Sequence, residues 1–158
     1  MRFYVATRLE NAAAARALAG ELRRRGHHQT YDWTVHGSVR GDAGALVRVA
    51  TAEVLGVLAA ELFVALLPGG RGTHAELGIA LAAGASADLA SGARRLVILV
   101  GDHGGVGEGT CAFYHHSRVS RVATDEEALA LVDTWSAAEE VPDVAEVTRR
   151  HGLVGERP

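Results

Sequence analysis

Apolar residues along the chain fall into five short runs, and these runs predict the strands of a sheet. They occupy residues 2–6, 28–33, 62–67, 94–100 and 118–123. The third run has no polar interruption and the fourth is continuous after two arginines, as is typical of central parallel strands covered on both faces. The pattern therefore predicts a five-stranded, mostly parallel sheet.

Between these runs, apolar residues recur at helical spacing. They predict helices at about 11–25, 45–60, 74–83 and 125–135. Strands and helices that alternate through right-handed crossovers place helices on both faces of one sheet. We expect a three-layer α/β fold within a single domain, residues 1–138.

The remaining segments have the composition of connections and ends. Residues 34–44 are a loop with three glycines, 84–92 are a small-residue linker, and 101–109 are a glycine-rich loop. Residues 139–158 are charged and weakly patterned, so we expect a C-terminal tail with at most one short helix.

Composition narrows the classes of function. The net charge of −3 does not favour a nucleic-acid polymer as partner. All 16 basic residues are arginine, which excludes a Walker-type phosphate loop and a Schiff-base enzyme because both need lysine. The histidines and the single cysteine lack metal-binding spacing, so we expect neither a metal nor another cofactor.

The same sequence gives expectations about location. The start has no basic, apolar leader, and no apolar run reaches about 18 residues. Cys111 has no partner for an internal disulfide. We expect a soluble protein of the reducing cytoplasm, without a membrane partner.

The stretch 66–78 combines a strand end, a glycine-rich turn and a helix start. The backbone N–H groups of the turn can curl toward an anion, and Arg71 can add a bidentate contact to phosphate. Because the carboxyl ends of parallel strands share one edge of the sheet, we expect this turn to form a crevice with residues 4–8 and 102–116.

Two interpretations compete for Glu76. Thr73 and Glu76 have the spacing of a capping box, in which both side chains satisfy N–H groups at a helix start. Alternatively, the positive helix end keeps the carboxylate ionised, which is a good state for a nucleophile. A substrate with a phosphate and an electrophilic carbon, such as C1 of a sugar, would suit that second interpretation.

Other candidates lie at a strand tip and in a helix. Asp32 and Trp33 end the second predicted strand, at the edge where open α/β sheets bind ligands. Trp33 is therefore either a ligand contact or an aromatic of the core or rim. Glu53 lies amid the apolar pattern of the helix at 45–60.

Several of these segments together resemble the nucleoside 2-deoxyribosyltransferase-like family, over about the first 125 residues. The resemblance rests on Phe3-Tyr4-Val5-Ala6 before a helix, on Glu53, and on the run from Gly70 to Gly78 with its G-x-x-x-E-L-G signature. Thr30-Tyr31-Asp32-Trp33-Thr34 and Phe113-Tyr114-His115 make the chain most similar to a small bacterial branch, related to nucleoside 5′-monophosphate N-glycosidases.

The resemblance implies a flavodoxin-like or Rossmann-like sheet and cleavage of the bond between a sugar and a nucleobase. Glu76 matches the glutamate that attacks C1 of the (deoxy)ribose to form a glycosyl-enzyme, in the manner of retaining glycosidases. Tyr4 matches the tyrosine that positions this glutamate, and Glu53 stands where an aspartate often assists the departing base. The implied partners are a small nucleoside or nucleotide and further copies of the chain, as a homodimer or higher homo-oligomer.

The expected substrate-binding residues come from the turns and strand tips. They are Arg8, Asp32, Trp33, Gly69, Gly70, Arg71, Gly72, Thr73, His74, Phe113, Tyr114 and His115.

Two departures from the family pattern bear on the reaction. Gly70 stands where the transferases usually have an acidic residue, and no match to their C-terminal asparagine is evident. Arg8, Arg71 and the glycine amides can instead hold a 5′-phosphate, which favours a nucleotide N-glycosidase. Transfer of deoxyribose between bases, a non-catalytic nucleotide-binding or sensor module, and NAD cleavage remain open as alternatives.

Overall fold

The computed structural model describes residues 1–90, 95–102, 104 and 110–137. Within these ranges five parallel strands form one sheet in the order β2-β1-β3-β4-β5. The strands are β1 (Arg2–Ala6), β2 (His28–Gln29), β3 (Leu62–Leu66), β4 (Leu96–Val100) and β5 (Val119–Val122). The predicted five-stranded α/β fold is confirmed, and its strand order is that of flavodoxin-like proteins.

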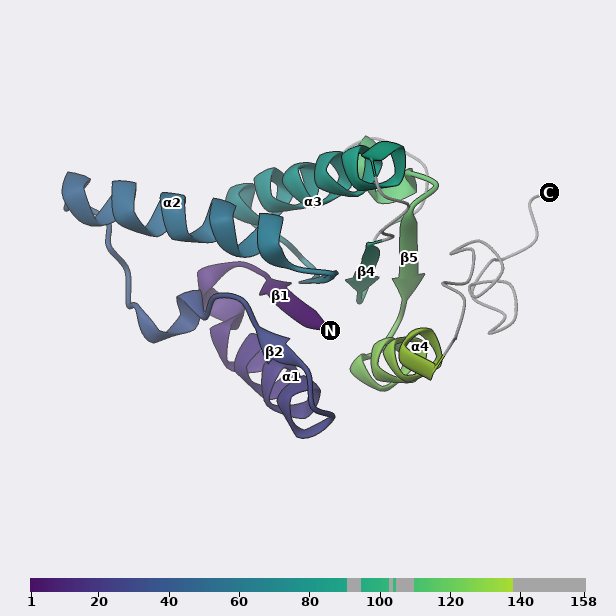
Figure 1. Ribbon diagram of the computed structural model, residues 1–158. Helices are drawn as coiled ribbons and strands as arrows, with labels where there is room; N and C mark the ends of the chain where they lie inside the picture. Colours follow the sequence, from purple (N-terminus) through teal and green to yellow (C-terminus); the bar gives the residue numbers. More distant parts are fainter. Residues whose placement is uncertain (91–94, 103, 105–109, 138–158) are drawn as a thin grey trace.

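Among the described residues, four α-helices cover the sheet. They are α1 (Ala12–Arg24), α2 (Ala43–Ala59), α3 (Arg71–Ala90) and α4 (Asp125–Ala137). Three short 3₁₀ helices, η1 (Leu9–Asn11), η2 (Trp33–Val35) and η3 (Ala112–His115), lie in the connections. Figure 1 shows α1 and α4 on one face of the sheet and α2 and α3 on the other, which makes the three predicted layers.

Two predicted boundaries are wrong, and both concern the candidate site. β2 ends at Gln29 instead of residue 33, because this edge strand pairs only with β1 and the chain then turns into η2. α3 begins at Arg71 and continues to Ala90, through most of the segment expected to be a linker. Small residues such as alanine favour helix strongly enough to continue it past Gly84.

Two expectations lie partly or wholly outside the described residues. The glycine-rich loop expected at 101–109 lies mostly outside the described residues. The described residues between β4 and β5 contain η3 and no longer helix. The tail expected at 139–158 and the end of the domain at 138 fall outside the described ranges, so both remain predictions.

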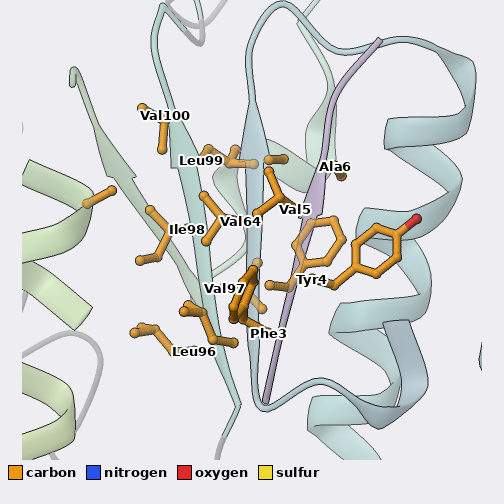
Figure 2. Packing of buried hydrophobic residues seen from close by; sticks show 14 of the residues in the cluster. Phe3, Tyr4, Val5, Ala6, Val64, Leu96, Val97, Ile98, Leu99 and Val100 are labelled. Carbon is orange, nitrogen blue, oxygen red and sulfur yellow. The ribbon is translucent and has the colours of Figure 1, made fainter. Parts of the chain in front are cut away.

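Every residue of β3 and β4 is buried, as expected for central strands covered by helices. Figure 2 shows the cluster, with the Tyr4 ring at its side and the Tyr4 hydroxyl pointing away from the strands. The buried face of α3 comprises Thr73, Glu76, Leu77, Ala80, Leu81 and Gly84. Their helical spacing places Glu76 on the side of α3 that faces the interior, whereas the neighbouring Ala75 is exposed.

α2 buries much less apolar surface than its sequence suggested. Only Gly56 and Val57 are fully buried. Three residues of the apolar pattern, Leu46, Val54 and Leu58, are exposed. A helix of 17 residues is about 25 Å long, whereas five-residue strands span about 17 Å. α2 therefore extends past the sheet, as Figure 1 shows.

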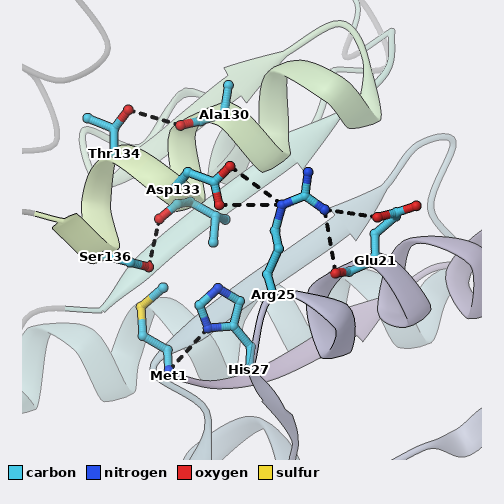
Figure 3. A network of polar contacts seen from close by, with 9 residues as sticks. Met1, Glu21, Arg25, His27, Ala130, Asp133, Thr134 and Ser136 are labelled. Atoms are coloured by element: carbon cyan, nitrogen blue, oxygen red, sulfur yellow. Dashed lines mark hydrogen bonds and ion pairs between the residues drawn. The ribbon is translucent and has the colours of Figure 1, made fainter.

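Polar contacts join α1 and α4 on the other face of the sheet (Figure 3). Arg25, just after α1, forms an ion pair with Glu21 at 2.9 Å and with Asp133 of α4 at 3.4 Å. The Met1 amino group lies 3.2 Å from His27 Nδ1. Gly26 has φ +82°, a left-handed conformation that suits glycine just after the end of α1. These surface contacts lie apart from the candidate site.

Candidate active site

A pocket with a volume of about 730 Å³ opens at the carboxyl ends of β1 and β3. Its walls are the segment after β1, the loop from η2 into α2, the inner side of α2, and the first turns of α3. β1 and β3 flank the point where the strand order reverses, which is where open α/β sheets bind ligands. Candidate residues that line it are Arg8, Trp33, Glu53, Gly70, Arg71, Gly72, Thr73 and Glu76.

The Glu76 carboxyl group lies in the wall of this pocket and is 8% exposed. Its Oε1 accepts a hydrogen bond of 2.5 Å from the hydroxyl of Tyr4, a fully buried residue of β1. The Tyr4 ring stacks on Phe63 of β3, with centroids 6.1 Å apart and an interplanar angle of 3°. Two central strands therefore hold Tyr4, and Tyr4 orients the carboxyl group.

Burial raises the pKa of Glu76 from 4.5 to about 7. The hydrogen bond from Tyr4 opposes this shift, and the charge of Glu53 adds to it. The sequence interpretation of a carboxylate kept ionised by the helix end is therefore wrong, because Glu76 lies beyond the first turn and is desolvated. At neutral pH the group exists in both protonation states, so it can lose or gain a proton during a reaction.

The capping box predicted for Thr73 and Glu76 is also absent. α3 begins two residues before Thr73, and the Thr73 hydroxyl accepts a hydrogen bond of 3.1 Å from the N–H of Gly70. The Thr73 hydroxyl therefore satisfies the backbone N–H of Gly70, the residue that precedes the helix. This leaves Glu76 without a capping role, and its partner is Tyr4.

Glu53 supplies a second carboxyl group to the pocket from α2. It is half-buried, and burial raises its pKa. No hydrogen bond or ion pair in the described part of the chain involves the Glu53 carboxyl group, so the group is available to a ligand.

Gly56 lets α2 approach β1 closely, one turn after Glu53. A Cβ atom at Gly56 would lie 2.8 Å from the Tyr31 Cβ and 3.2 Å from the Tyr4 ring. Glycine is therefore needed at this position if the helix that carries Glu53 is to pack against Tyr4.

Trp33 is both an aromatic of the core and a residue of the pocket wall. Its indole is 9% exposed, and Nε1 donates a hydrogen bond of 2.8 Å to the Val5 carbonyl. The same residue lines the pocket. Trp33 thus anchors η2 to β1 and presents a fixed aromatic surface beside the carboxyl groups.

Three arginines, Arg8, Arg40 and Arg71, line the pocket and are exposed. Within the described residues none of their guanidinium groups has a hydrogen bond or an ion pair. Guanidinium groups without a protein partner suit an anionic ligand, and phosphate is one that arginine contacts in bidentate fashion.

The structure does not bring six of the expected substrate-binding residues to the pocket. They are Asp32, Gly69, His74, Phe113, Tyr114 and His115. Asp32 instead caps η2 by accepting from the Thr34 N–H at 3.0 Å. Tyr114 contacts the ring of His74, so η3 reaches the start of α3 from outside the pocket. None of the described residues of the expected segment 102–116 lines the pocket, whereas the segment from η2 into α2 does.

The sequence analysis missed several lining residues. They are Leu9, Glu10, His36, Gly37, Ser38, Val39, Arg40, Leu46, Val49 and Ala50. For the last three a signal existed, because they precede Glu53 at spacings of seven, four and three residues and so share its helix face. The loop residues had no comparable pattern.

Two further features are absent from the described residues. No group of three or more His, Cys, Asp or Glu side chains is placed to hold a metal ion. None of the described helices has the length and apolar character that spanning a membrane requires.

The fold and the pocket define a three-layer α/β protein with a pocket at the switch point of its sheet. One solved structure of similar fold is CMP N-glycosidase BcmB from Clostridium botulinum. The likeness has a TM-score of 0.52 at 17% sequence identity and covers 84% of this chain and 99% of the other. At this identity it shows the fold alone. No protein-family model and no curated protein matches the chain.

Proposed function

We propose that this protein is a nucleotide N-glycosidase that cleaves the bond between the sugar and the base of a nucleoside 5′-monophosphate. The observation that carries the proposal is the Glu76 carboxyl group, which is buried, lies in the pocket wall and is oriented by Tyr4. The sequence resemblance to the nucleoside 2-deoxyribosyltransferase-like family and the likeness in fold to a CMP N-glycosidase support the same reaction class.

In the proposed reaction, an oxygen of the ionised Glu76 attacks C1′ of the sugar. The bond from C1′ to the base nitrogen breaks, and its electron pair leaves with the base, which takes a proton from the Glu53 carboxyl group. Water then attacks C1′ of the glycosyl-enzyme ester, gives its proton to the Glu53 carboxylate, and releases Glu76. Two displacements at C1′ retain its configuration.

The arginines support a phosphorylated substrate over a free nucleoside. Arg8 lies close to Gly70, the residue before Arg71, because a Cβ atom at Gly70 would be 3.4 Å from the Arg8 Cβ, and both arginines line the pocket. Together with the N–H groups of the first turn of α3 they form the cationic side of the pocket. The 5′-phosphate would bind at this cationic side, and the sugar or base would pack against Trp33.

We expect purified protein to release free base from at least one ribo- or deoxyribonucleoside 5′-monophosphate, and to act more slowly on the matching nucleosides. Liquid chromatography of timed reactions measures both. In Arg71→Gln the KM for the monophosphate should rise about 10–100-fold, since one charge-assisted phosphate contact is lost. Arg48→Gln is the matched control, because Arg48 is exposed on α2 and does not line the pocket.

Adding a second free base to the same reactions separates hydrolysis from transfer. Formation of a new nucleotide with the added base would replace the hydrolase proposal with the transferase alternative. Binding of monophosphates without release of base would instead support the sensor alternative and would refute the proposed enzyme.

The outer face of α2 supports the proposed homo-oligomer. Val47 and Leu55 are 67% and 60% exposed, and the neighbouring Val54 and Leu58 are also exposed. These side chains follow one another at helical spacing, and the opposite side of α2 lines the pocket. A contiguous apolar face of this kind is typical of interaction surfaces, and two copies can cover it symmetrically.

We expect Leu55→Glu to weaken self-association at least about tenfold, because the change buries an unpaired carboxylate at the interface. Sedimentation equilibrium of the wild type and the variant measures this. Ala17→Glu is the control, since Ala17 is exposed on α1 at the other face of the sheet. A wild-type protein that stays monomeric at high concentration would contradict the proposed assembly.

A further inference from the structure

His74 and Tyr114 form a contact beside the pocket that the proposed reaction does not use. The Tyr114 hydroxyl lies 2.8 Å from His74 Nε2, and the two rings stack with centroids 5.5 Å apart at 14°. His74 belongs to the first turn of α3 and Tyr114 to η3, so the contact joins segments that are 40 residues apart. Both side chains are half-buried, and neither lines the pocket.

The second nitrogen of His74 contacts the turn that does line the pocket. His74 Nδ1 lies 2.6 Å from the Gly70 carbonyl oxygen. A carbonyl only accepts, so Nδ1 carries the hydrogen and, in the neutral ring, Nε2 accepts from the Tyr114 hydroxyl. Tyr114 thereby orients the ring that donates to Gly70.

Gly70 is held from both sides of its backbone. Its carbonyl also accepts the backbone N–H of His74 at 3.2 Å, and its N–H donates to the Thr73 hydroxyl at 3.1 Å. The residues that follow, Arg71 and Gly72, have no described acceptor for their N–H groups and lie in the pocket wall. The direction of these free groups therefore depends on the Gly70 peptide.

We infer that His74 and Tyr114 are positioning residues, which hold the Gly70 peptide so that the first turn of α3 keeps the shape that binds the 5′-phosphate. This inference rests on the proposed function for the identity of the phosphate. The pair acts from outside the pocket, through hydrogen bonds to the turn. It differs from Arg71, whose guanidinium group reaches the pocket directly.

Two substitutions at His74 test the inference. Asparagine can place its side-chain N–H where His74 Nδ1 donates, whereas leucine fills similar space without a donor. We expect His74→Leu to raise the KM for the monophosphate about tenfold, with kcat and turnover of the unphosphorylated nucleoside little changed. His74→Asn should recover most of that loss, and Tyr114→Phe, which keeps the stacked ring, should raise the KM about two- to fivefold.

A purely structural role would change the KM for the monophosphate, kcat and the turnover of the nucleoside together. Equal losses of kcat on the monophosphate and the nucleoside, or equal effects of His74→Leu and His74→Asn, would overturn the inference. Tyr114→Phe provides a second test should His74→Leu fail to fold. An unchanged KM for the monophosphate in Tyr114→Phe would then overturn the inference.

Calorimetric titration of the full chain with the 5′-monophosphates of the common nucleosides separates this inference from the proposed function. If the wild type binds a monophosphate but releases no base, the proposed enzyme fails, and weaker binding by His74→Leu, with recovery in His74→Asn, still supports the positioning pair. If the wild type binds none of them, the positioning role fails as well.

Discussion

Replacing Glu76 with glutamine is expected to reduce base release at least about a thousandfold, with little change in monophosphate binding. Glutamine keeps the size of the side chain and an oxygen that can accept from the Tyr4 hydroxyl. It cannot form the glycosyl ester, because a neutral amide is a poor nucleophile. Base release by chromatography and binding by calorimetry measure the two effects separately.

Glu126→Gln serves as the control for this substitution, because it makes the same change on the exposed surface of α4, on the other face of the sheet. Its activity should equal that of the wild type. Substantial base release by Glu76→Gln would contradict the nucleophile assignment and would leave Glu53 as the carboxyl group to test next.

The same Glu76→Gln substitution is expected to stabilise the protein above pH 7. The pKa of Glu76 is raised in the folded chain, from 4.5 to about 7, so ionisation is disfavoured by folding. The stability that the neutral carboxyl group allows is fully present below pH 4.5 and is lost as the pH rises through 7. A shift of this size corresponds to about 3 kcal/mol.

Urea unfolding of the wild type and of Glu76→Gln at pH 5 and pH 8.5 measures this difference. We expect the advantage of the variant to grow by about 2–3 kcal/mol between the two pH values. Other titrating groups are common to both proteins and cancel in the comparison. An advantage that does not change with pH would mean that Glu76 is not desolvated in the folded chain. Destabilisation that is linked to activity in this way is expected of a functional residue.

The strands were predictable because their signal is local. A strand covered on both faces must be apolar along its whole length, and the runs of β3 and β4 satisfy this requirement. Edge strand β2 carried no such constraint, and its predicted length was wrong. The start of α3 was misplaced by three residues, because Gly72 in its first turn has a low helix propensity.

Within the site, the sequence marked the two carboxyl residues and Tyr4 through a resemblance, and it marked the glycine turn through its composition. It did not indicate which residues share a wall. The β2-β1-β3 order brings α2 and α3 to the same face of the sheet. Only for this reason does one pocket have walls from both Leu46, Val49 and Ala50 and the first turn of α3.

The amino-acid sequence by itself determined the class of fold and the chemical groups on offer, because periodicity and residue type are properties of short segments. Only the tertiary structure decided the environment of Glu76. A capping residue would have its carboxylate in water at a helix end, whereas the structure buries Glu76 against Tyr4 in a pocket wall. That difference depends on contacts between residues 72 positions apart, and such contacts exist only once the sheet has formed.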